Sequence, residues 1–517
     1  MRIRSPHSRP LSRALPVTVA VAALLAVTGC DSQPDGTSSG SGKTLSLAII
    51  GTPNSFEPSQ LVEGQQTYVW NSIFDTLLLQ DNRGKLSPGA AESWEYSADA
   101  RTLTLQLRKG MEFSSGTPVT AAAVKATLER IKATPGPNQV ALRSVSSVGT
   151  SGDHGVTIKL TQPDGALLYT LSGASGVIGD PKTMTSKGAA LNPVGSGPYT
   201  LDKSATVNGS VYVLKRRDDY WNKKAYPFPT VKVRVIADRT AAVNALKAGE
   251  INAGSVEVTQ ADTLKTSGFE VKHVDATAAG VLTLADRDGK LLKPLGDVRV
   301  RKAINMAFDR DKIVEQILQG AGEATAQSFN PKGQAYDKAL DTTYPYDPAE
   351  AKRLMAEAGY AKGFTASMPS MVYTKPFEPT ITQSLRDIGI TVKWETVPAQ
   401  QTVSALLSKK FPMFFTMDGL NTTPIELRNT FDPTGARNVF KTTDERFDML
   451  LKQANSKADP TEAADMYKEI NSLTVKDAWN APVFHVGTYW VTKKGITYLG
   501  DGSSTFSTIR QFGVAGQ

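Results

Sequence analysis

Patterns typical of β-strands are followed by patterns typical of α-helices along most of this 517-residue chain. The stretch RTLTLQLR (101–108) places Leu103, Leu105 and Leu107 on one face, as expected for a half-buried strand. A helix pattern follows, and Thr120 is a good N-cap for it. Chains that alternate strands and helices bury both in shared layers, so we predict an α/β fold.

The same order of elements recurs farther along the chain. Residues 231–254 are predicted to form a strand and then a helix capped by Asp238. Residues 297–320 and 347–360 have helix patterns, and residues 379–397 have a helix followed by a strand. Length alone suggests about three folding units, because a single core rarely grows beyond 250–300 residues.

The first 29 residues have the features of an export signal. Four arginines and no acidic residue precede an apolar run (14–26), which is shorter than the roughly 20 residues that cross a bilayer. Val27-Thr28-Gly29-Cys30 resembles a bacterial lipobox, in which the thiol becomes a diacylglyceryl thioether and the signal is cut just before it. We therefore expect a lipoprotein signal peptide (1–29), lipidation at Cys30 and a flexible Ser/Gly-rich tether (30–43).

Charge and residue counts argue against several other classes of protein. The net charge is +8, but four of the positive charges lie in residues 1–29 and the lysines are scattered, unlike a nucleic-acid-binding surface. Cys30 is the only cysteine, which leaves no disulfide or thiolate ligand. His154, His273 and His485 lack paired spacing, so we expect no metal site and no cofactor. No H-E-x-x-H motif or nucleophile elbow in a folded context occurs, so we expect no catalytic residues and no enzyme.

Six blocks of sequence resemble the extracellular solute-binding proteins of family 5, the peptide and nickel receptors of ABC importers. The blocks occur in the order of that family and span nearly all of the expected mature chain. They are LSPGAAESWEYSADARTLTLQLRKGMEFSSGTPVTAAAVKATLERI (86–131), NPVGSGPYTL (192–201), RRDDYWNKK (216–224), RVIADRTAAVNALKAGEIN (234–252), DVRVRKAINMAFDRDKIV (297–314) and AKRLMAEAGYAKG (351–363).

The resemblance implies a two-lobed periplasmic-binding-protein fold, type II-like, with a ligand cleft between the lobes. By analogy, lobe one covers residues 44–285, with an inserted subdomain at about 76–188. Lobe two covers residues 286–484, and residues 485–517 return to lobe one.

The resemblance also implies where a ligand would bind. Peptide receptors of this family neutralise the ligand's N-terminal amine with an aspartate on lobe two, and Asp418 takes that place in FPMFFTMDGLNTTP (411–424). Its neighbours Met417 and Gly419 are expected at the site, although the family usually has an aromatic residue where Gly419 stands. An Asp-Gly turn after a strand is the structural alternative.

Three further groups of residues are candidates. In MVYTKPFEPTIT (371–382), Lys375 takes the place of a basic residue that meets the ligand's carboxylate in dipeptide receptors, and Phe377 that of a nearby aromatic. A solvated loop lysine is the alternative, and lysine lacks arginine's two-pronged geometry. Tyr489 and Trp490 are expected either to line the cleft or to pack at the hinge.

The expected function is that of a membrane-anchored, extracytoplasmic substrate-binding protein of an ABC importer. It would capture oligopeptides between hinged lobes as a monomer, and would pass them to permease subunits at the outer face of the cytoplasmic membrane or in the periplasmic space. The same receptor role for a nickel metallophore, haem, an opine or a sugar oligomer remains an alternative. A peptide-sensing surface lipoprotein and a secreted hydrolase are alternatives of other classes.

Overall fold

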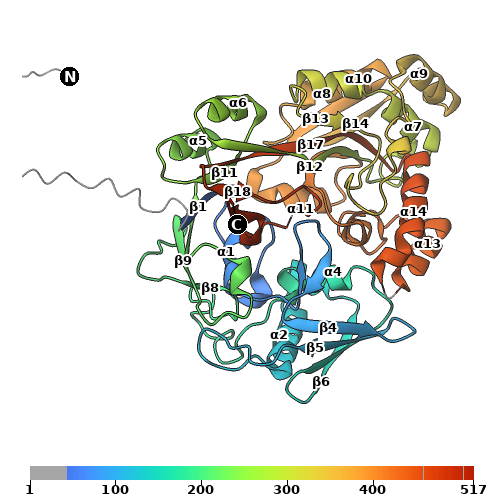
Figure 1. The fold of residues 1–517 in the computed structure, drawn as a ribbon. Helices are drawn as coiled ribbons and strands as arrows, with labels where there is room; N and C mark the ends of the chain where they lie inside the picture. The colour runs from blue at the N-terminus through green and yellow to red at the C-terminus, as the bar shows by residue number, and fades with distance from the viewer. Residues whose placement is uncertain (1–43, 458, 505, 517) are drawn as a thin grey trace, which may run out of the picture. The chain divides into compact units, whose positions relative to one another are not determined.

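The computed structural model describes residues 44–457, 459–504 and 506–516 (Figure 1). The predicted signal peptide, Cys30 and the tether lie outside these described residues. All described residues belong to one unit of the chain, which begins at Gly40. Within this part of the chain, no helix is long and apolar enough to cross a membrane.

A nine-stranded mixed sheet is the largest element. Its strand order is β16-β12-β17-β11-β1-β10-β9-β8, and β13 pairs with β17. Strand β1 is parallel to β10 and β11, whereas the other pairs are antiparallel. The strands are β1 (Thr44–Ile49), β8 (Tyr199–Leu201), β9 (Val211–Arg216), β10 (Thr230–Val235), β11 (Ala253–Val256), β12 (Glu270–Thr283), β13 (Gly322–Ala324), β16 (Phe414–Gly419) and β17 (Asn480–Thr492).

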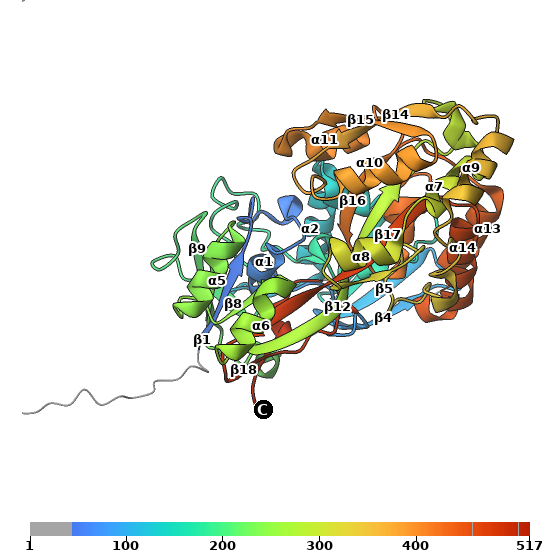
Figure 2. The same cartoon turned by 90° about the horizontal axis from the view of Figure 1, so that it is seen from above.

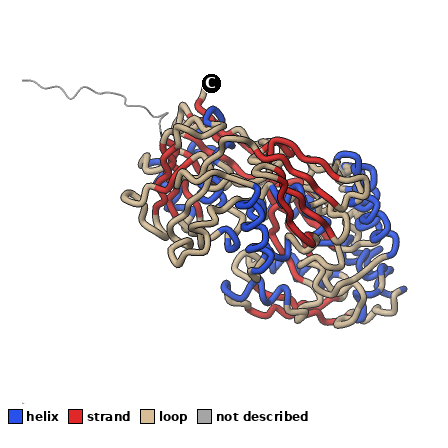
Figure 3. The backbone as a smooth tube through the Cα atoms, turned by 90° about the horizontal axis from the view of Figure 1, so that it is seen from below, coloured by secondary structure: helices blue, strands red, loops and turns tan. Residues whose placement is uncertain are grey.

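Two long strands, β12 and β17, connect the two ends of this sheet. Residues 489–492 of β17 pair with β11, and residues 484–486 of β17 pair with β13. Residues 278–283 of β12 pair with β16. Figure 2 shows β12 and β17 side by side between β1 at one end and α7 (Val298–Met306) at the other. The long strands and the helices that flank them are also visible in Figure 3.

The ladder between β12 and β17 has two irregularities, and the wider one lies between Val274 and Ala278. Val274 pairs with Thr488 and Ala278 with Val486, so residues 275–277 have no ladder partner on β17, although the hydroxyl of Thr277 donates to the carbonyl of Val486 at 3.4 Å. Only Gly487 lies opposite this gap. A Cβ atom added there would lie 2.1 Å from the carbonyl oxygen of Val274, so the close approach of the two strands requires glycine.

A separate four-stranded antiparallel sheet has its own core. Its order is β4 (Ala91–Tyr96), β5 (Thr102–Leu107), β7 (Gly155–Leu160) and β6 (Val145–Ser151). The predicted strand is β5, with Leu103, Leu105 and Leu107 fully buried. Helix α2 (Ala121–Ala133) follows, and the Oγ1 atom of Thr120 accepts a hydrogen bond from the Ala123 N–H, which confirms the predicted cap. Helices α3 (Pro137–Ala141) and α4 (Leu167–Leu171) complete this region.

Helices surround a parallel pair of strands near β16. Strand β14 (Phe364–Ser370) pairs with β15 (Ile390–Thr396). The predicted helix at 297–320 is divided into α7 and α8 (Arg310–Gln316), because Asp309 accepts a hydrogen bond from the Lys312 N–H and so caps a new helix. Helices α9 (Pro348–Glu357) and α10 (Glu378–Asp387) form where helix patterns were predicted.

The remaining elements are shorter or lie at the sides of the sheets. The helices are α1 (Thr67–Ile73), α5 (Arg239–Lys247), α6 (Val258–Thr266), α11 (Thr402–Leu407), α12 (Thr423–Glu426), α13 (Glu445–Asn455) and α14 (Ala464–Lys476). The strands are β2 (Leu78–Gln80), β3 (Leu86–Pro88), β18 (Ile496–Tyr498) and β19 (Phe512–Val514). The side chain of Asp238 caps α5 by accepting from the Ala241 N–H at 2.7 Å, as predicted. The alternation of helices and strands confirms the predicted α/β class.

Candidate functional site

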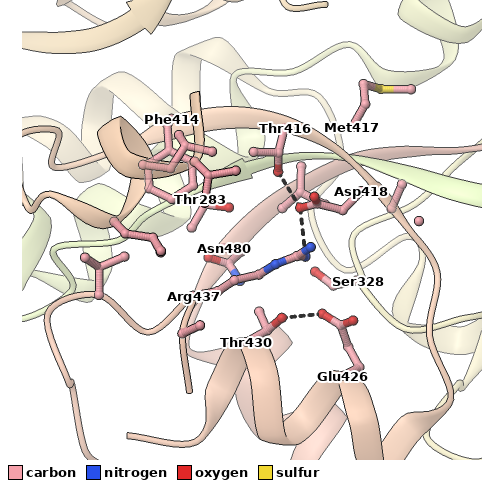
Figure 4. A pocket seen from close by; sticks show the side chains of 18 of the residues that line it. Thr283, Ser328, Phe414, Thr416, Met417, Asp418, Glu426, Thr430, Arg437 and Asn480 are labelled. Atoms are coloured by element: carbon pink, nitrogen blue, oxygen red, sulfur yellow. Dashed lines mark hydrogen bonds and ion pairs between the residues drawn. The ribbon is translucent and has the colours of Figure 1, made fainter. Parts of the chain in front are cut away.

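A cavity of about 420 Å³ lies beside β16 (Figure 4). Cavities of roughly 300–1,000 Å³ commonly hold small ligands. Its walls come from β12, β16, α11, the start of β17 and the segment after α12. The lining residues are Ala279, Val281, Thr283, Ser328, Tyr373, Thr402, Val403, Leu406, Leu407, Phe414, Thr416, Met417, Asp418, Gly419, Leu420, Glu426, Thr430, Ala436, Arg437, Val439 and Asn480.

Strand β16 delivers a carboxylate to this cavity because its side chains alternate between two faces. Phe415 and Met417 pack in the hydrophobic core around β14 and α10. On the other face, Thr416 is buried and Asp418 is half-buried. Among the described strands, β16 pairs with β12 alone, with Asp418 opposite Ala279. The apolar half of the strand thus fixes the polar half at the cavity wall.

Asp418 forms an ion pair inside the cavity. Its Oδ2 atom lies 2.9 Å from Nη1 of Arg437 and accepts a hydrogen bond from the hydroxyl of Thr416 at 2.7 Å (Figure 4). Both contacts use Oδ2, and no donor among the described residues forms a hydrogen bond with Oδ1. The second oxygen can therefore accept a hydrogen bond from a ligand.

Arg437 reaches Asp418 from the loop that follows α12. The backbone N–H of Arg437 donates to the carbonyl of Asn429 at 2.9 Å. The next residue, Asn438, is buried and donates to the carbonyls of Phe431 and Thr442. These contacts hold the loop, whereas the guanidinium itself is held only by its ion pair among the described residues. Its Nη2 and Nε donors can meet a ligand.

Tyr373 adds a hydroxyl next to the ion pair. Burial, together with the nearby charge of Asp418, raises the pKa of Tyr373 to about 12. The phenol therefore stays protonated at neutral pH. Its O–H lies 3.1 Å from the sulfur of Met371, a weak acceptor that a better ligand acceptor could replace.

A second carboxylate lies across the cavity on an unusual helical turn. Glu426 ends α12 and is followed by a π-helix (Leu427–Phe431), a geometry frequent at functional sites. Glu426 is buried, and it accepts from the hydroxyl of Thr430 at 2.6 Å and from the amide of Asn421 at 3.1 Å. In the part of the chain that the structure describes, no cation pairs with it. With Asp418 and Arg437, the formal charge of the cavity is one negative, which favours a ligand with a positive group.

The rest of the wall is mostly apolar. Helix α11 contributes Val403, Leu406 and Leu407, of which Val403 is 70% and Leu407 44% exposed. Large apolar side chains with this exposure, at the rim of a cavity, are typical of ligand-binding surfaces. Among the described residues, no cluster of three or more His, Cys, Asp or Glu side chains could hold a metal ion.

The structure brings together three of the residues expected at the site. Asp418, Met417 and Gly419 all line the cavity. The side chain of Met417 packs against the core, so this residue borders the cavity mainly through the strand itself. Gly419 ends β16, and its carbonyl accepts a hydrogen bond from the amide of Asn421 at 3.2 Å.

Four other expected residues lie outside the cavity lining. Phe377 is buried behind β16, with its ring 5.2 Å from that of Phe415. Lys375 is exposed on the turn before α10. Tyr489 stacks on His273 and Trp490 on Tyr498, each at 4.4 Å between ring centroids. These two aromatic residues pack at the β11 end of the long strands.

Sequence reasoning did not find the residues that complete the site. Arg437 has no motif, and it reaches Asp418 only because the loop after the π-helix folds back. Glu426 and Thr430 are four residues apart, a spacing that places two side chains on one helical face. That spacing could have indicated a pair, but not its position beside Asp418. Tyr373 lies two residues before Lys375, on the same turn.

Comparisons with known proteins agree on one family. Residues 85–438 match the bacterial extracellular solute-binding proteins, family 5 Middle. The Dipeptide-binding protein of Pseudomonas aeruginosa is 24% identical over 523 residues, which cover 90% of this chain and 94% of that protein. The Glutathione-binding protein GsiB of Escherichia coli strain K12 is 27% identical over 456 residues, which cover 83% of this chain and 86% of that protein. These relatives are named as binding proteins.

Solved structures show the same fold. The periplasmic binding protein DppA from Helicobacter pylori, in complex with the peptide STSA, has a TM-score of 0.76 at 22% identity, covering 91% of this chain and 98% of its own. NikA from Brucella suis in complex with Fe(III)-EDTA has a TM-score of 0.77 at 24% identity, covering 91% of this chain and 99% of its own. AgaA from A. tumefaciens R10 in complex with agropinic acid has a TM-score of 0.76 at 23% identity, covering 92% of this chain and 99% of its own. The predicted two-lobed periplasmic-binding-protein fold is confirmed.

Proposed function

Because this chain belongs to the bacterial extracellular solute-binding proteins of family 5, we propose that it captures short peptides outside the cytoplasmic membrane and passes them to an ABC permease. The observation that carries the proposal is a carboxylate, Asp418, in a cavity of ligand size with one oxygen left for a donor. A relative named for dipeptides and a structural neighbour with a bound tetrapeptide support peptide as the ligand class.

Asp418 is the proposed anchor for the peptide's N-terminal ammonium. A charge pair inside a cavity is stronger than one at the surface, because less water screens it. The cavity's net negative charge also favours an ammonium. Main-chain groups of a peptide could meet the hydroxyls of Tyr373 and Thr430, while side chains rest on α11. Such binding depends on end charges and backbone groups and so tolerates different sequences.

We place the hinge at the interrupted ladder between β12 and β17. Of the proposed lobe boundaries, the one at residue 485 lies close to Gly487, whereas the one at residue 285 lies just beyond the end of β12. Residues of the two proposed lobes contact each other directly, since Nη1 of Arg428 donates to the hydroxyl of Thr170 at 2.5 Å. Ligand binding would favour the closed arrangement in which such contacts form.

Native mass spectrometry on the full chain purified in detergent tests the ligand class. Peptides of three to six residues would be offered with a free and with an acetylated N-terminus, and the panel repeated on Asp418→Asn. We expect free-amine peptides to be retained, acetylated ones to be lost, and the variant to bind at least tenfold more weakly. If no peptide of any length is retained, the peptide proposal is wrong.

We further propose that Cys30 carries the membrane anchor, as the lipobox-like sequence before it indicates. Two acyl chains bind a bilayer stably where one is marginal. Cys30→Ser is expected to move the protein from the membrane fraction to the soluble extracytoplasmic fraction. Retention of the variant in membranes would contradict the anchor, and metabolic labelling with palmitate would show whether the wild type is acylated.

A second candidate ligand class is a non-peptide solute in the same receptor role. The structural neighbours that hold agropinic acid and Fe(III)-EDTA favour an opine or a metal chelate as the alternative. If this alternative is right, an opine or a metal chelate offered in the same mass-spectrometric assay would be retained and peptides would not. A sensing role without import would be indicated if ligand is bound but deletion of the protein leaves peptide uptake unchanged.

A further inference from the structure

We propose that the cavity beside β16 selects ligands that carry an ammonium and a carboxylate on the same carbon atom, as at the head of a γ-linked peptide or in a free α-amino acid. This inference rests on the proposed function, because it specifies the end group by which the same site recognises its ligand. The residues that carry it are Asp418 and Arg437.

These two residues present opposite charges side by side. Oδ2 of Asp418 and Nη1 of Arg437 are 2.9 Å apart, and both side chains line the cavity (Figure 4). Within the described residues, Oδ1 of Asp418 accepts no hydrogen bond, and Nη2 and Nε of Arg437 donate none. The pair therefore offers one acceptor and several donors next to each other.

A ligand matches this pair only if its own two charges are adjacent. In an α-amino acid head the ammonium nitrogen and the carboxylate carbon are two bonds apart, so the group can pair head to tail with Asp418 and Arg437. In an ordinary α-linked peptide the terminal carboxylate moves away by about 3.5 Å for every added residue. Such a peptide can use Asp418 or Arg437 with its ends, but its terminal carboxylate cannot accompany its own ammonium.

The opposite charges of Asp418 and Arg437 also favour a head group that carries both an ammonium and a carboxylate. An ammonium alone must compete with Arg437 for the carboxylate of Asp418, and it adds a second cation beside the guanidinium. A head group with both charges gives Asp418 and Arg437 each a partner of opposite charge when water is excluded, and Glu426 keeps its hydrogen bonds from Thr430 and Asn421. The planar guanidinium also suits a carboxylate, with which it can form two parallel hydrogen bonds.

The ion pair is not explained by a role in the fold. The side chain of Arg437 is 39% exposed and that of Asp418 31%, and pairs with this exposure contribute little to stability. The buried Arg301 instead donates to backbone carbonyls, those of Leu295, Ala478 and Asp477.

The rest of the cavity fits the remainder of such a ligand. Val403, Leu406 and Leu407 form an apolar wall in the same cavity. Glu426 lies across from the ion pair and can accept an amide N–H in addition to its bonds from Thr430 and Asn421. A γ-glutamyl group attached to an apolar residue provides all three parts, namely the charged head, an amide and an apolar end.

Two isomers test the proposal directly. γ-Glutamyl-leucine amide and α-glutamyl-leucine amide have the same composition and net charge, and they differ only in which carboxylate forms the peptide bond. Their affinities for the full chain in detergent would be measured by titration calorimetry, with free leucine as a third ligand. We expect the γ-isomer to bind at least tenfold more tightly than the α-isomer. Leucine binding would show whether the head alone suffices.

Variants assign the preference to Arg437. Arg437→Gln should weaken the γ-isomer at least tenfold, change the α-isomer less than threefold, and so remove the preference. Arg437→Lys keeps the charge but not the fork, and should give an intermediate loss. Arg446→Gln is the matched control, because Arg446 forms a 2.8 Å ion pair with Glu469 outside the cavity. It should change neither affinity.

Equal affinities of the two isomers, or a preference that persists in Arg437→Gln, would overturn the inference. If α-peptides bind through Asp418 without any γ-preference, the proposed function stands and only the inference falls. If no peptide binds but leucine binds and requires Arg437, the inference stands and the peptide proposal falls. If none of the ligands binds, both fall.

Discussion

Arg310 and Arg437 use the same side chain in opposite ways. Arg310 is buried, and its guanidinium donates to the carbonyls of Thr325, Pro482, Asn305 and Tyr344 and to the side-chain oxygen of Asn305. Burial lowers the pKa of Arg310 to about 10, so it stays charged at neutral pH. Its donors are all directed at the fold.

The guanidinium of Arg437 makes a single ion pair and borders a cavity. Nothing in the fold around it depends on its remaining donors. This contrast indicates which arginines are available to a ligand. An arginine whose donors are saturated by backbone carbonyls ties segments together, whereas one with free donors beside a carboxylate is available for recognition.

The largest effect is expected for Arg310→Met. The substitution leaves several buried carbonyls without donors, and each such group costs about 1–3 kcal/mol. We expect the free energy of unfolding to fall by at least about 3 kcal/mol, measured by urea denaturation. Arg446→Met at the exposed pair with Glu469 is the control and should stay within about 0.5 kcal/mol. If Arg310→Met lowers the free energy of unfolding by less than about 1 kcal/mol, Arg310 does not tie the fold together as proposed.

Two other buried groups test the same contrast, because each has an atom without a hydrogen-bond partner, whereas the donors of Arg310 are all bonded. Nε2 of His485 and Oδ2 of Asp75 have no hydrogen-bond partner among the described residues. Burial lowers the pKa of His485 to about 4 and raises that of Asp75 to about 6. The unfolded chain protonates His485 near pH 6.5, so this residue makes stability fall as the pH drops from about 6.5 to 4.

Asp75 acts in the opposite direction, because the folded state binds its proton first. Its contribution makes stability rise as the pH drops from about 6 to 4. His485→Gln should therefore make the protein more acid-stable than the wild type, and Asp75→Asn should stabilise it at pH 7 but not at pH 4. Each difference is on the order of 2 kcal/mol across that range. Urea midpoints between pH 4 and 8 measure both, and parallel curves for variant and wild type would contradict the assignment.

A smaller change in stability is expected for Arg437→Met. Loss of a half-exposed ion pair changes the free energy of unfolding by less than about 1 kcal/mol. The measurement is the same denaturation series as for Arg310→Met. A loss close to that of Arg310→Met would show that Arg437 also serves the fold.

The smallest effect is expected for Lys375→Ala. Lys375 is exposed and lies outside the cavity lining, so we propose that it meets the carboxylate only of peptides that extend beyond the cavity. An exposed ion pair is worth at most about 1 kcal/mol and weakens with salt. Affinity for five-residue peptides should fall less than fivefold at low salt and not at all for two-residue ones. A large loss for short peptides would place Lys375 inside the site.

Local features of the fold could be predicted from the sequence, because their causes lie within a few residues. The alternation at Leu103 and Leu105 and the caps at Thr120 and Asp238 depend only on neighbouring positions. Residues of the site could be predicted only in part. Asp418 was inferred from the resemblance, whereas the ion pair with Arg437 forms between two segments that meet only in the folded chain.

The same distinction explains the turn before α10. The sequence singled out Lys375, and the structure places Tyr373 in the cavity lining instead. A shift of two residues on a turn redirects a side chain, and no periodic pattern fixes that direction in a loop. The direction of a side chain on a helix or strand can therefore be predicted from the periodic pattern, whereas on a loop it depends on contacts with neighbouring segments.

The gap opposite Gly487 has a mechanical consequence. Since residues 275–277 have no ladder partner on β17, a twist at this point stretches no ladder pair and strains the side-chain bond from Thr277 to the carbonyl of Val486. We infer that contacts between the two proposed lobes, such as the hydrogen bond from Arg428 to Thr170, provide part of the resistance to such a twist. Such contacts, together with the bound solute, would then set the equilibrium between the open and closed arrangements of the proposed lobes.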